Sequence, residues 1–163
     1  MKKNNFCQVI VNAVVANEGK ILICRRNIED GHRSTTWTIP EGSIEDIQEG
    51  DEVSDIIEKT LNEKVRKEVG VEISGNVRLI ANKCYRDPRE GTVLELAFLC
   101  EFKRDVKQDI ENTSHVKWIS SQELNDYEFA GDVRDQIAKG FALLPFMIRR
   151  KPLSRRSDNL TRN

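Results

Sequence analysis

One amphipathic helix set among strand-like segments constrains the fold of this 163-residue chain more than any other feature. Helical spacing of apolar residues predicts a helix over 51–69, and Gly70 follows it as a stop signal. The residues that carry this spacing are Val53, Ile56, Ile57, Leu61, Val65 and Val69. A helix with one apolar stripe has to bury that stripe against another element, so the neighbouring strands are its natural partners.

Alternating or β-branched runs, bounded by turn residues, indicate strands on both sides of this helix. The predicted strands cover residues 6–16, 19–26, 77–85, 92–103 and 115–120, with a short extended segment at 37–42. In 92–103 apolar residues alternate with Glu95, Ala97 and Glu101, which predicts a half-buried strand. A helical turn begins at "SSQEL", and a final helix is predicted over 130–143. The pattern predicts an α/β fold in which helices pack on a mixed sheet.

The distribution of charge limits the partners of the chain. The whole sequence has a net charge of −1, but residues 149–163 hold six basic residues against one acid. We therefore expect a single domain over 1–148 and a basic, disordered tail over 149–163. The tail lacks interleaved aromatic residues, which disfavours nucleic-acid binding, although RNA association through the tail stays open as an alternative. No segment is long enough to span a membrane. The sequence leaves open whether the chain forms a homodimer.

Cysteine usage points to a reducing compartment. The four cysteines are Cys7, Cys24, Cys84 and Cys100. They lie in apolar, strand-like stretches without a CxxC pair or a nearby histidine, which predicts four buried thiols in a cytoplasmic protein. The N-terminal residues resemble a signal peptide in outline, but Gln8 and Asn12 interrupt the apolar run, so a strand is favoured.

Charged residues fall within the apolar sector of the predicted helix. At about 100° per residue, Lys64 and Glu68 project among Ile57, Leu61 and Val65, and Lys67 lies at the edge of the sector. Charges at such positions are costly unless they are paired or open into a polar cleft. Two explanations follow: an i,i+4 ion pair between Lys64 and Glu68, or a helix face that borders a ligand site.

The same region resembles the signature of Nudix hydrolases, G-x5-E-x7-R-E-U-x-E-E-x-G-U with U apolar. The similar segments are "PEG" at 40–42, an acid-rich loop, and "TLNEKVRKEVGVEI" at 60–73. "ILICRRN", "HVKWISSQEL" and "FAGDVRDQIAKGF" are also similar to parts of that family, so the resemblance covers roughly residues 6–145. It implies an α/β/α sandwich with a mixed sheet.

The resemblance also implies a chemistry. In the family, clustered helix acids bind Mg²⁺ or Mn²⁺, which neutralise a diphosphate and activate water for attack on phosphorus. The implied activity is cleavage of the pyrophosphate bond in a nucleoside diphosphate derivative.

The sequence departs from the signature at its most important positions. Glu63 stands at the arginine position, Lys64 and Lys67 stand at acid positions, and only Glu68 remains. The three ligand positions thus change from −3 to +1. Unit charges 4 Å apart interact by about 4 kcal/mol at an effective dielectric constant near 20, so these lysines should repel a metal ion.

The resemblance leaves two functions open: a hydrolase with an altered metal site, or a weak or inactive module that binds nucleotides or regulates. The candidate catalytic residues are Glu68 and Glu63. Asp51 and Glu52 are the best candidates to join Glu68 as metal ligands, because the longer connection after Gly42 leaves the family's first acid without a unique counterpart. The candidate substrate-binding residues are Arg25, Arg26, Gly42, Lys64 and Lys67.

Overall fold

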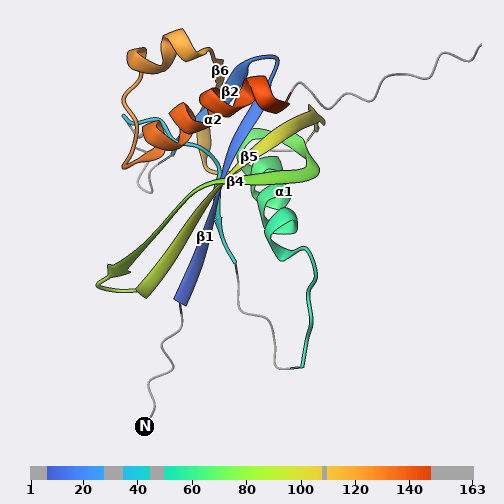
Figure 1. Cartoon of the computed structure of the whole chain (residues 1–163), viewed down its shortest axis with the longest axis vertical. Helices are drawn as coiled ribbons and strands as arrows, with labels where there is room; N and C mark the ends of the chain where they lie inside the picture. Colours follow the sequence, from blue (N-terminus) through green and yellow to red (C-terminus); the bar gives the residue numbers. More distant parts are fainter. Residues whose placement is uncertain (1–6, 28–34, 45–49, 108–109, 148–163) are drawn as a thin grey trace, which may run out of the picture.

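The computed structural model describes residues 7–27, 35–44, 50–107 and 110–147. The elements are β1 (Cys7–Asn17), β2 (Lys20–Arg26), β3 (Glu41–Ser43), α1 (Ile56–Val69), β4 (Val71–Asp87), β5 (Gly91–Asp105), β6 (Thr113–Ile119), the 3-10 helix η1 (Ser121–Asp126) and α2 (Val133–Met147). They form the expected mixed sheet with packed helices (Figure 1). The predicted tail and the acidic stretch 45–49 lie outside the described residues.

β1 is the centre of the sheet and has different partners along its length. The strand order is β4-β5-β1-β2-β6, and β1 runs parallel to β5 from Cys7 to Ala16. On its other side, residues 10–12 of β1 pair with β3, and residues 16–17 pair with β2. The other pairings are antiparallel. Because β1 divides its second edge between two partners, the short β3 is brought into the middle of the sheet.

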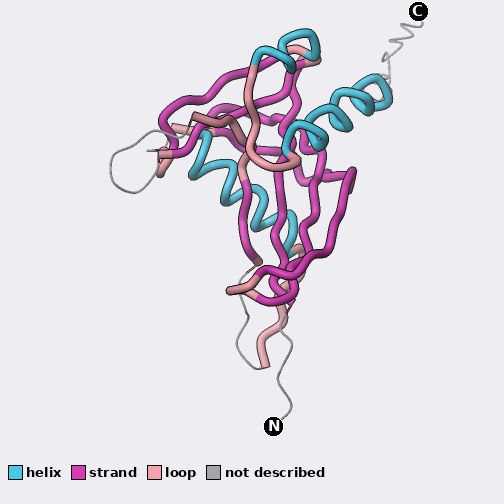
Figure 2. Tube along the Cα trace, turned by 90° about the vertical axis from the view of Figure 1, so that its left-hand side faces the viewer, coloured by secondary structure: helices cyan, strands magenta, loops and turns pink. Residues whose placement is uncertain are grey.

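Alternation along the strands supplies one apolar layer for each helix. Val11, Ala13 and Val15 of β1 join the core beneath α1, whereas Val14 and Ala16 join the core beneath α2. The tube in Figure 2 shows the strands running between two separate helices. This arrangement confirms the α/β/α sandwich, and it assigns each polar residue on β1 or β2 to one helix side.

α1 is shorter at its start than the sequence predicts. Gly50 and Asp55 have φ angles of 91° and 56°, which are incompatible with a right-handed helix, and the helix begins at Ile56. Val53 therefore does not belong to the buried stripe and is 39% exposed. The predicted end is confirmed: Gly70 has a φ of 68°, and its N–H donates to the Arg66 carbonyl at 3.1 Å.

The β4–β5 hairpin corrects two further predictions. β4 begins directly after Gly70, earlier than predicted, and its distal residues 82–86 are exposed. Cys84 lies in that part and is an exposed free thiol, unlike the buried Cys24 and Cys100. In β5 residues 97–100 are all buried, because the strand is covered on both faces there rather than on one.

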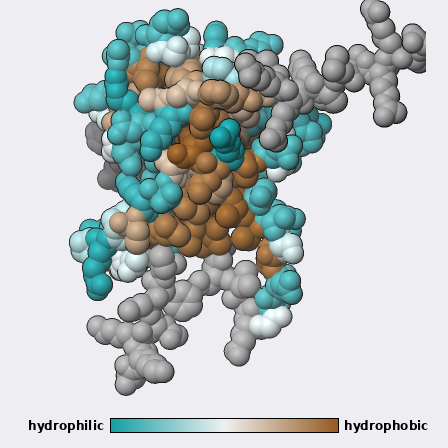
Figure 3. Space-filling view, in the orientation of Figure 1, coloured by the Kyte–Doolittle hydropathy of each residue, from teal (hydrophilic) through white to brown (hydrophobic). Residues whose placement is uncertain are grey.

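The surface between the β4–β5 hairpin and the segment leading to α1 is apolar in Figure 3. It continues the core beneath α1, where Val9, Ile44 and Leu96 are only partly buried. None of the helices in the described part of the chain combines the length and apolarity required to cross a bilayer.

Candidate ligand site

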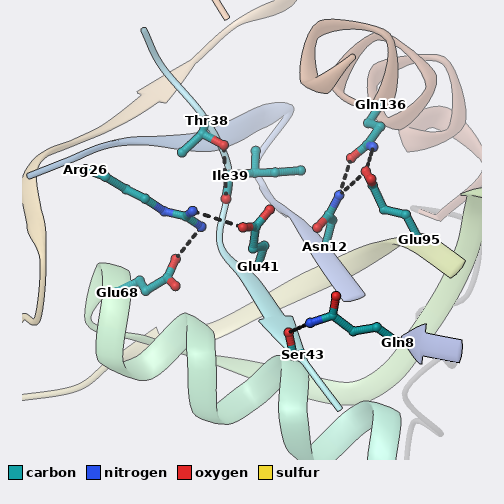
Figure 4. Close-up of polar contacts among 10 residues, drawn as sticks. All are labelled: Gln8, Asn12, Arg26, Thr38, Ile39, Glu41, Ser43, Glu68, Glu95 and Gln136. Atoms are coloured by element: carbon teal, nitrogen blue, oxygen red, sulfur yellow. Dashed lines mark hydrogen bonds and ion pairs between the residues drawn. The ribbon is translucent and has the colours of Figure 1, made fainter. Parts of the chain in front are cut away.

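Arg26 joins two carboxylates that come from different elements (Figure 4). It is the last residue of β2, and alternation along that strand places its side chain on the α1 side, in line with Leu22 and Cys24. Its Nη1 donates to Glu41 Oε1 at 3.0 Å, and its Nη2 lies 3.6 Å from Glu68 Oε2. Glu41 opens β3 and Glu68 stands in the last turn of α1, so three elements converge on one guanidinium.

The carboxylate of Glu68 is only partly compensated. Burial, reinforced by the nearby charge of Glu41, raises the pKa of Glu68 above its ordinary value. The charge of Arg26, the backbone N–H of Glu41 and the charge of Lys64 oppose this rise. Glu68 Oε2 and Arg26 Nη2 are both buried, and neither has a hydrogen-bond partner within the described residues. Burial also raises the pKa of the Cys24 thiol to about 12, so this neighbouring group is a neutral thiol and not a nucleophile.

The two cavity lysines of α1, Lys64 and Lys67, make different contacts. Lys67 Nζ lies 2.7 Å from Glu63 Oε1, four residues earlier on the exposed side of the helix. Lys64 forms no ion pair with Glu68, so the first explanation for these charges does not hold. Its stem packs instead on Gly42, where a Cβ would lie 2.5 Å from Lys64 Cγ. Gly42 is thus required for close packing against α1.

A cavity of about 110 Å³ opens over these groups. Its lining residues are Arg26, Lys64, Lys67, Glu68, Glu111, Asn112 and Thr113. We call this set the α1 cluster, together with Glu41. The cavity combines three cationic groups with the carboxylates of Glu68 and Glu111, and Lys64 forms no ion pair within the described residues. The cations of this cavity can bind an anionic ligand with several acceptor oxygens.

A second polar group, the β5 cluster, lies on the α2 side of the sheet. It consists of Asn12, Glu95, Gln136, Lys83 and Asp132. Asn12 Nδ2 donates to Glu95 Oε1 at 2.8 Å and to Gln136 Oε1 at 3.1 Å, and Gln136 Nε2 donates to Glu95 at 2.9 Å. Asn12 is only 2% exposed, and its Oδ1 has no partner within the described residues.

Lys83 closes the β5 cluster towards the surface. Its Nζ lies 3.3 Å from Glu95 Oε2 and 3.0 Å from Asp132 Oδ1. Lys83, Glu95, Asp132 and Gln136 line another cavity of about 110 Å³ between the β4–β5 strands and the start of α2. Two lysines and three acids line it together with Asn82 and Gln136, so it offers both donors and acceptors to the polar edge of a ring.

The pairing of β1 with β3 sets the two clusters side by side. Asn12 and Glu41 are directly opposite each other in the register, and each belongs to one cluster. Figure 4 shows Asn12 between Glu41 and the pair Glu95–Gln136. The sequence contained one signal for this arrangement, because Asn12 interrupts an otherwise apolar strand; nothing in the sequence indicated its partners.

Several predicted site residues lie apart from the α1 cluster. Arg25 faces the other side of the sheet, where its guanidinium lies 5.6 Å from the centre of the Trp37 ring. Asp51 and Glu52 are exposed in the segment that leads to the start of α1. Glu68 lies near the opposite end of that helix, roughly 18 Å further along its axis at 1.5 Å per residue. Their role as metal ligands stays a prediction.

The described residues do not fit a divalent metal. No three histidine, cysteine or carboxylate side chains in the described part of the chain are grouped so that they could hold a metal ion. Glu41 and Glu68, the two carboxylates that do converge, already share Arg26. Magnesium requires several oxygen ligands in near-octahedral geometry, and a guanidinium supplies none.

The sandwich and the two clusters define a domain with two small polar cavities, one beside α1 and one beside α2, and the comparisons give its family. The NUDIX domain family matches residues 8–139. The chain therefore belongs to the Nudix hydrolase family, as the signature resemblance predicted. No curated protein matches this sequence.

Solved structures with the same fold share little sequence with this chain. A NUDIX hydrolase from Nitrosomonas europaea superposes with a TM-score of 0.63 at 17% identity, covering 84% of this chain and 90% of the other. The NUDIX domain of Shewanella oneidensis NrtR, complexed with ADP ribose, gives 0.60 at 21% identity, with coverages of 85% and 89%. An ADP-ribose pyrophosphatase from Streptococcus suis gives 0.58 at 19% identity, with coverages of 84% and 91%.

Proposed function

We propose that this chain binds a nucleoside diphosphate derivative across the two clusters, with the diphosphate at the α1 cluster and the ring system at the β5 cluster. The observation that carries this proposal is the register of β1 and β3, which sets Asn12 opposite Glu41. One cavity, with three cations, belongs to the α1 cluster, and another, of mixed donors and acceptors, belongs to the β5 cluster. A nucleotide has the same two parts.

The charge of the α1 cluster supports binding more than turnover. Lys64 and Lys67 occupy positions at which the Nudix signature has acids, and Arg26 is shared by Glu41 and Glu68. Cationic side chains bind phosphate oxygens directly through charge-assisted hydrogen bonds. The chain then acts as a catalytically weak or inactive nucleotide-binding module, and ADP-ribose is a ligand to test first, since the NrtR domain was solved with it.

Hydrolysis with an altered metal site is the second candidate. One observation favours it: Glu68, the remaining acid of the signature, is kept at the cavity and has a raised pKa. Glu63 would assist it as a catalytic residue, and Asp51 and Glu52 would join Glu68 in holding Mg²⁺ or Mn²⁺. The described residues do not fit a divalent metal, which weighs against this candidate.

A paired measurement separates the two functions. Binding of ADP-ribose, nucleotide sugars, dinucleotides and nucleoside triphosphates is measured by calorimetry, and release of phosphate or a nucleoside monophosphate is measured with Mg²⁺ and with Mn²⁺. We expect binding without turnover. Turnover in the wild type that is lost in Glu68→Gln would establish the hydrolase instead. If no compound binds under any condition, the proposed function is wrong.

The reversion Lys64→Glu/Lys67→Glu adds a second test. It restores two acids of the signature on the same helix. Activity that appears only in this variant would show that the lysines disabled an ancestral enzyme, which agrees with a binding role for the present chain.

A further inference from the structure

Arg26 holds the position between two carboxylates that a bound cation would take. Its Nη1 contact with Glu41 is a full hydrogen bond at 3.0 Å, whereas its Nη2 contact with Glu68 is a wider ion pair at 3.6 Å. Glu41 and Glu68 come from β3 and α1, and Arg26 comes from β2. The guanidinium therefore links three elements that contribute residues to the α1 cluster.

The wider contact leaves one donor group of Arg26 without an acceptor. Nη2 of Arg26 and Oε2 of Glu68 are buried without hydrogen-bond partners within the described residues. Lys64 lies beside them, with its stem fixed against Gly42, and it forms no ion pair within the described residues. An incoming phosphate oxygen would give Arg26 the acceptor that it lacks and would give Lys64 a counter-ion.

We propose that Arg26 is the resident cation of this site, so that it excludes a divalent metal and holds the diphosphate directly together with Lys64. This inference rests on the proposed function and adds how the diphosphate is held. A divalent ion near Glu68 would meet the positive charge of Arg26 in addition to that of the lysines. Restoring the acids at 64 and 67 is then insufficient for metal binding while Arg26 remains.

The first test measures Mn²⁺ binding by electron paramagnetic resonance and requires no nucleotide. We expect no site-bound Mn²⁺ in the wild type and only weak binding in Lys64→Glu/Lys67→Glu. Adding Arg26→Gln to that double variant should tighten binding at least tenfold, whereas adding Arg26→Lys, which keeps the charge, should not. Thermal melting confirms that each variant is folded.

Two results of this first test would overturn the inference. One is Mn²⁺ binding to the double variant that is as tight as to the triple variant with Arg26→Gln. The other is Mn²⁺ binding to the wild type that Glu68→Gln abolishes, a result that requires no Arg26 variant to fold.

The second test measures pyrophosphate binding by calorimetry, once with EDTA and once with Mg²⁺. We expect binding in EDTA that weakens at least tenfold in Arg26→Gln and in Lys64→Gln, and that is unchanged in Lys59→Gln, an exposed lysine on the same helix. Pyrophosphate binding that requires Mg²⁺, or no binding in either buffer, would overturn the inference. Nucleotide binding that requires a metal would remove this inference but leave the proposed function intact.

Discussion

Glu68 and Glu72 stand on either side of Gly70 and are similarly buried, yet their carboxylates behave in opposite ways. Their side chains are 18% and 11% exposed. Glu72 accepts hydrogen bonds from Lys103 at 2.7 Å and from Arg104 Nε at 2.8 Å, and these hold its pKa at about 2. Burial raises the pKa of Glu68, whose nearest cation stays at 3.6 Å.

The two carboxylates differ in how completely nearby cations compensate their negative charge. Glu72 has its partners on the adjacent strand, directly across from it or one residue away, so its ion pairs form wherever β4 and β5 pair. Glu68 pairs with Arg26 of β2, which also pairs with Glu41. A ligand gains most binding energy beside a cavity where a buried charge is incompletely compensated. Glu72 is therefore part of a structural ion pair, whereas Glu68 borders a candidate ligand site.

The largest loss of stability is expected at a third carboxylate, Glu95, because both of its oxygens have polar partners. Asn12 and Gln136 both donate to Oε1 of Glu95, and Lys83 pairs with Oε2. In Glu95→Gln one of these oxygens becomes an NH₂ group, so the side chain loses its charge and can no longer accept at both positions. We expect a loss of about 2 kcal/mol in the free energy of unfolding, measured with urea at pH 7. Glu101→Gln, an exposed position on the same strand, is the control, and an equal loss there would contradict the prediction.

Glu72→Gln should have the next largest effect, a fall of a few degrees in melting temperature at pH 7. Because the folded pKa is below the ordinary value of 4.5, the stability that Glu72 contributes is present above that value. It is lost as the pH falls towards about 2, so wild type and variant should converge there. A difference that does not shrink with falling pH would show that the carboxylate charge is not responsible.

Glu68→Gln should behave in the opposite way. Its folded pKa is raised above 4.5, so its favourable contribution exists below that value and is lost as the pH rises through the folded pKa. At pH 7 the buried charge therefore costs stability, and the variant should melt at the same temperature as the wild type or slightly above it. A fall at pH 7 as large as that of Glu72→Gln would break the comparison.

The smallest loss of stability is expected for Glu63→Gln, which removes the partner of Lys67 in an exposed i,i+4 pair. Such pairs contribute about 0.3–0.5 kcal/mol, and salt screens them. The loss of stability should disappear in 1 M salt, roughly ten times the ionic strength at which the Debye length is about 10 Å. A salt-independent loss would show that Glu63 has a further role.

Local sequence patterns predicted much of the fold. The helix end at Gly70, the strands at 6–16 and 19–26, and the helical turn at "SSQEL" were all predicted from spacing and turn residues, and the structure has them. The errors arose where local pattern and backbone geometry disagree. Val53 continues the apolar spacing, but the left-handed conformations of Gly50 and Asp55 keep it out of the helix.

The candidate site was predicted less completely than the fold. The sequence singled out Arg26, Lys64 and Glu68 through a family signature and through charges within an apolar stripe. It gave no indication that Glu41 pairs with Arg26, or that Glu95 contacts Asn12 across 83 positions of sequence. Glu95 even follows the alternation of an ordinary solvent-facing strand residue.

The sequence by itself determined which segments become helices and strands, that they form a mixed sheet, and which charges depart from the family signature. Periodicity and turn chemistry act over a few residues, so they can be read along the chain. Only the tertiary structure decided which charges meet. Strand register places Asn12 opposite Glu41, and the packing of α1 lets Glu41 and Glu68 share Arg26. Both are set by contacts among elements far apart in the chain, which local patterns do not specify.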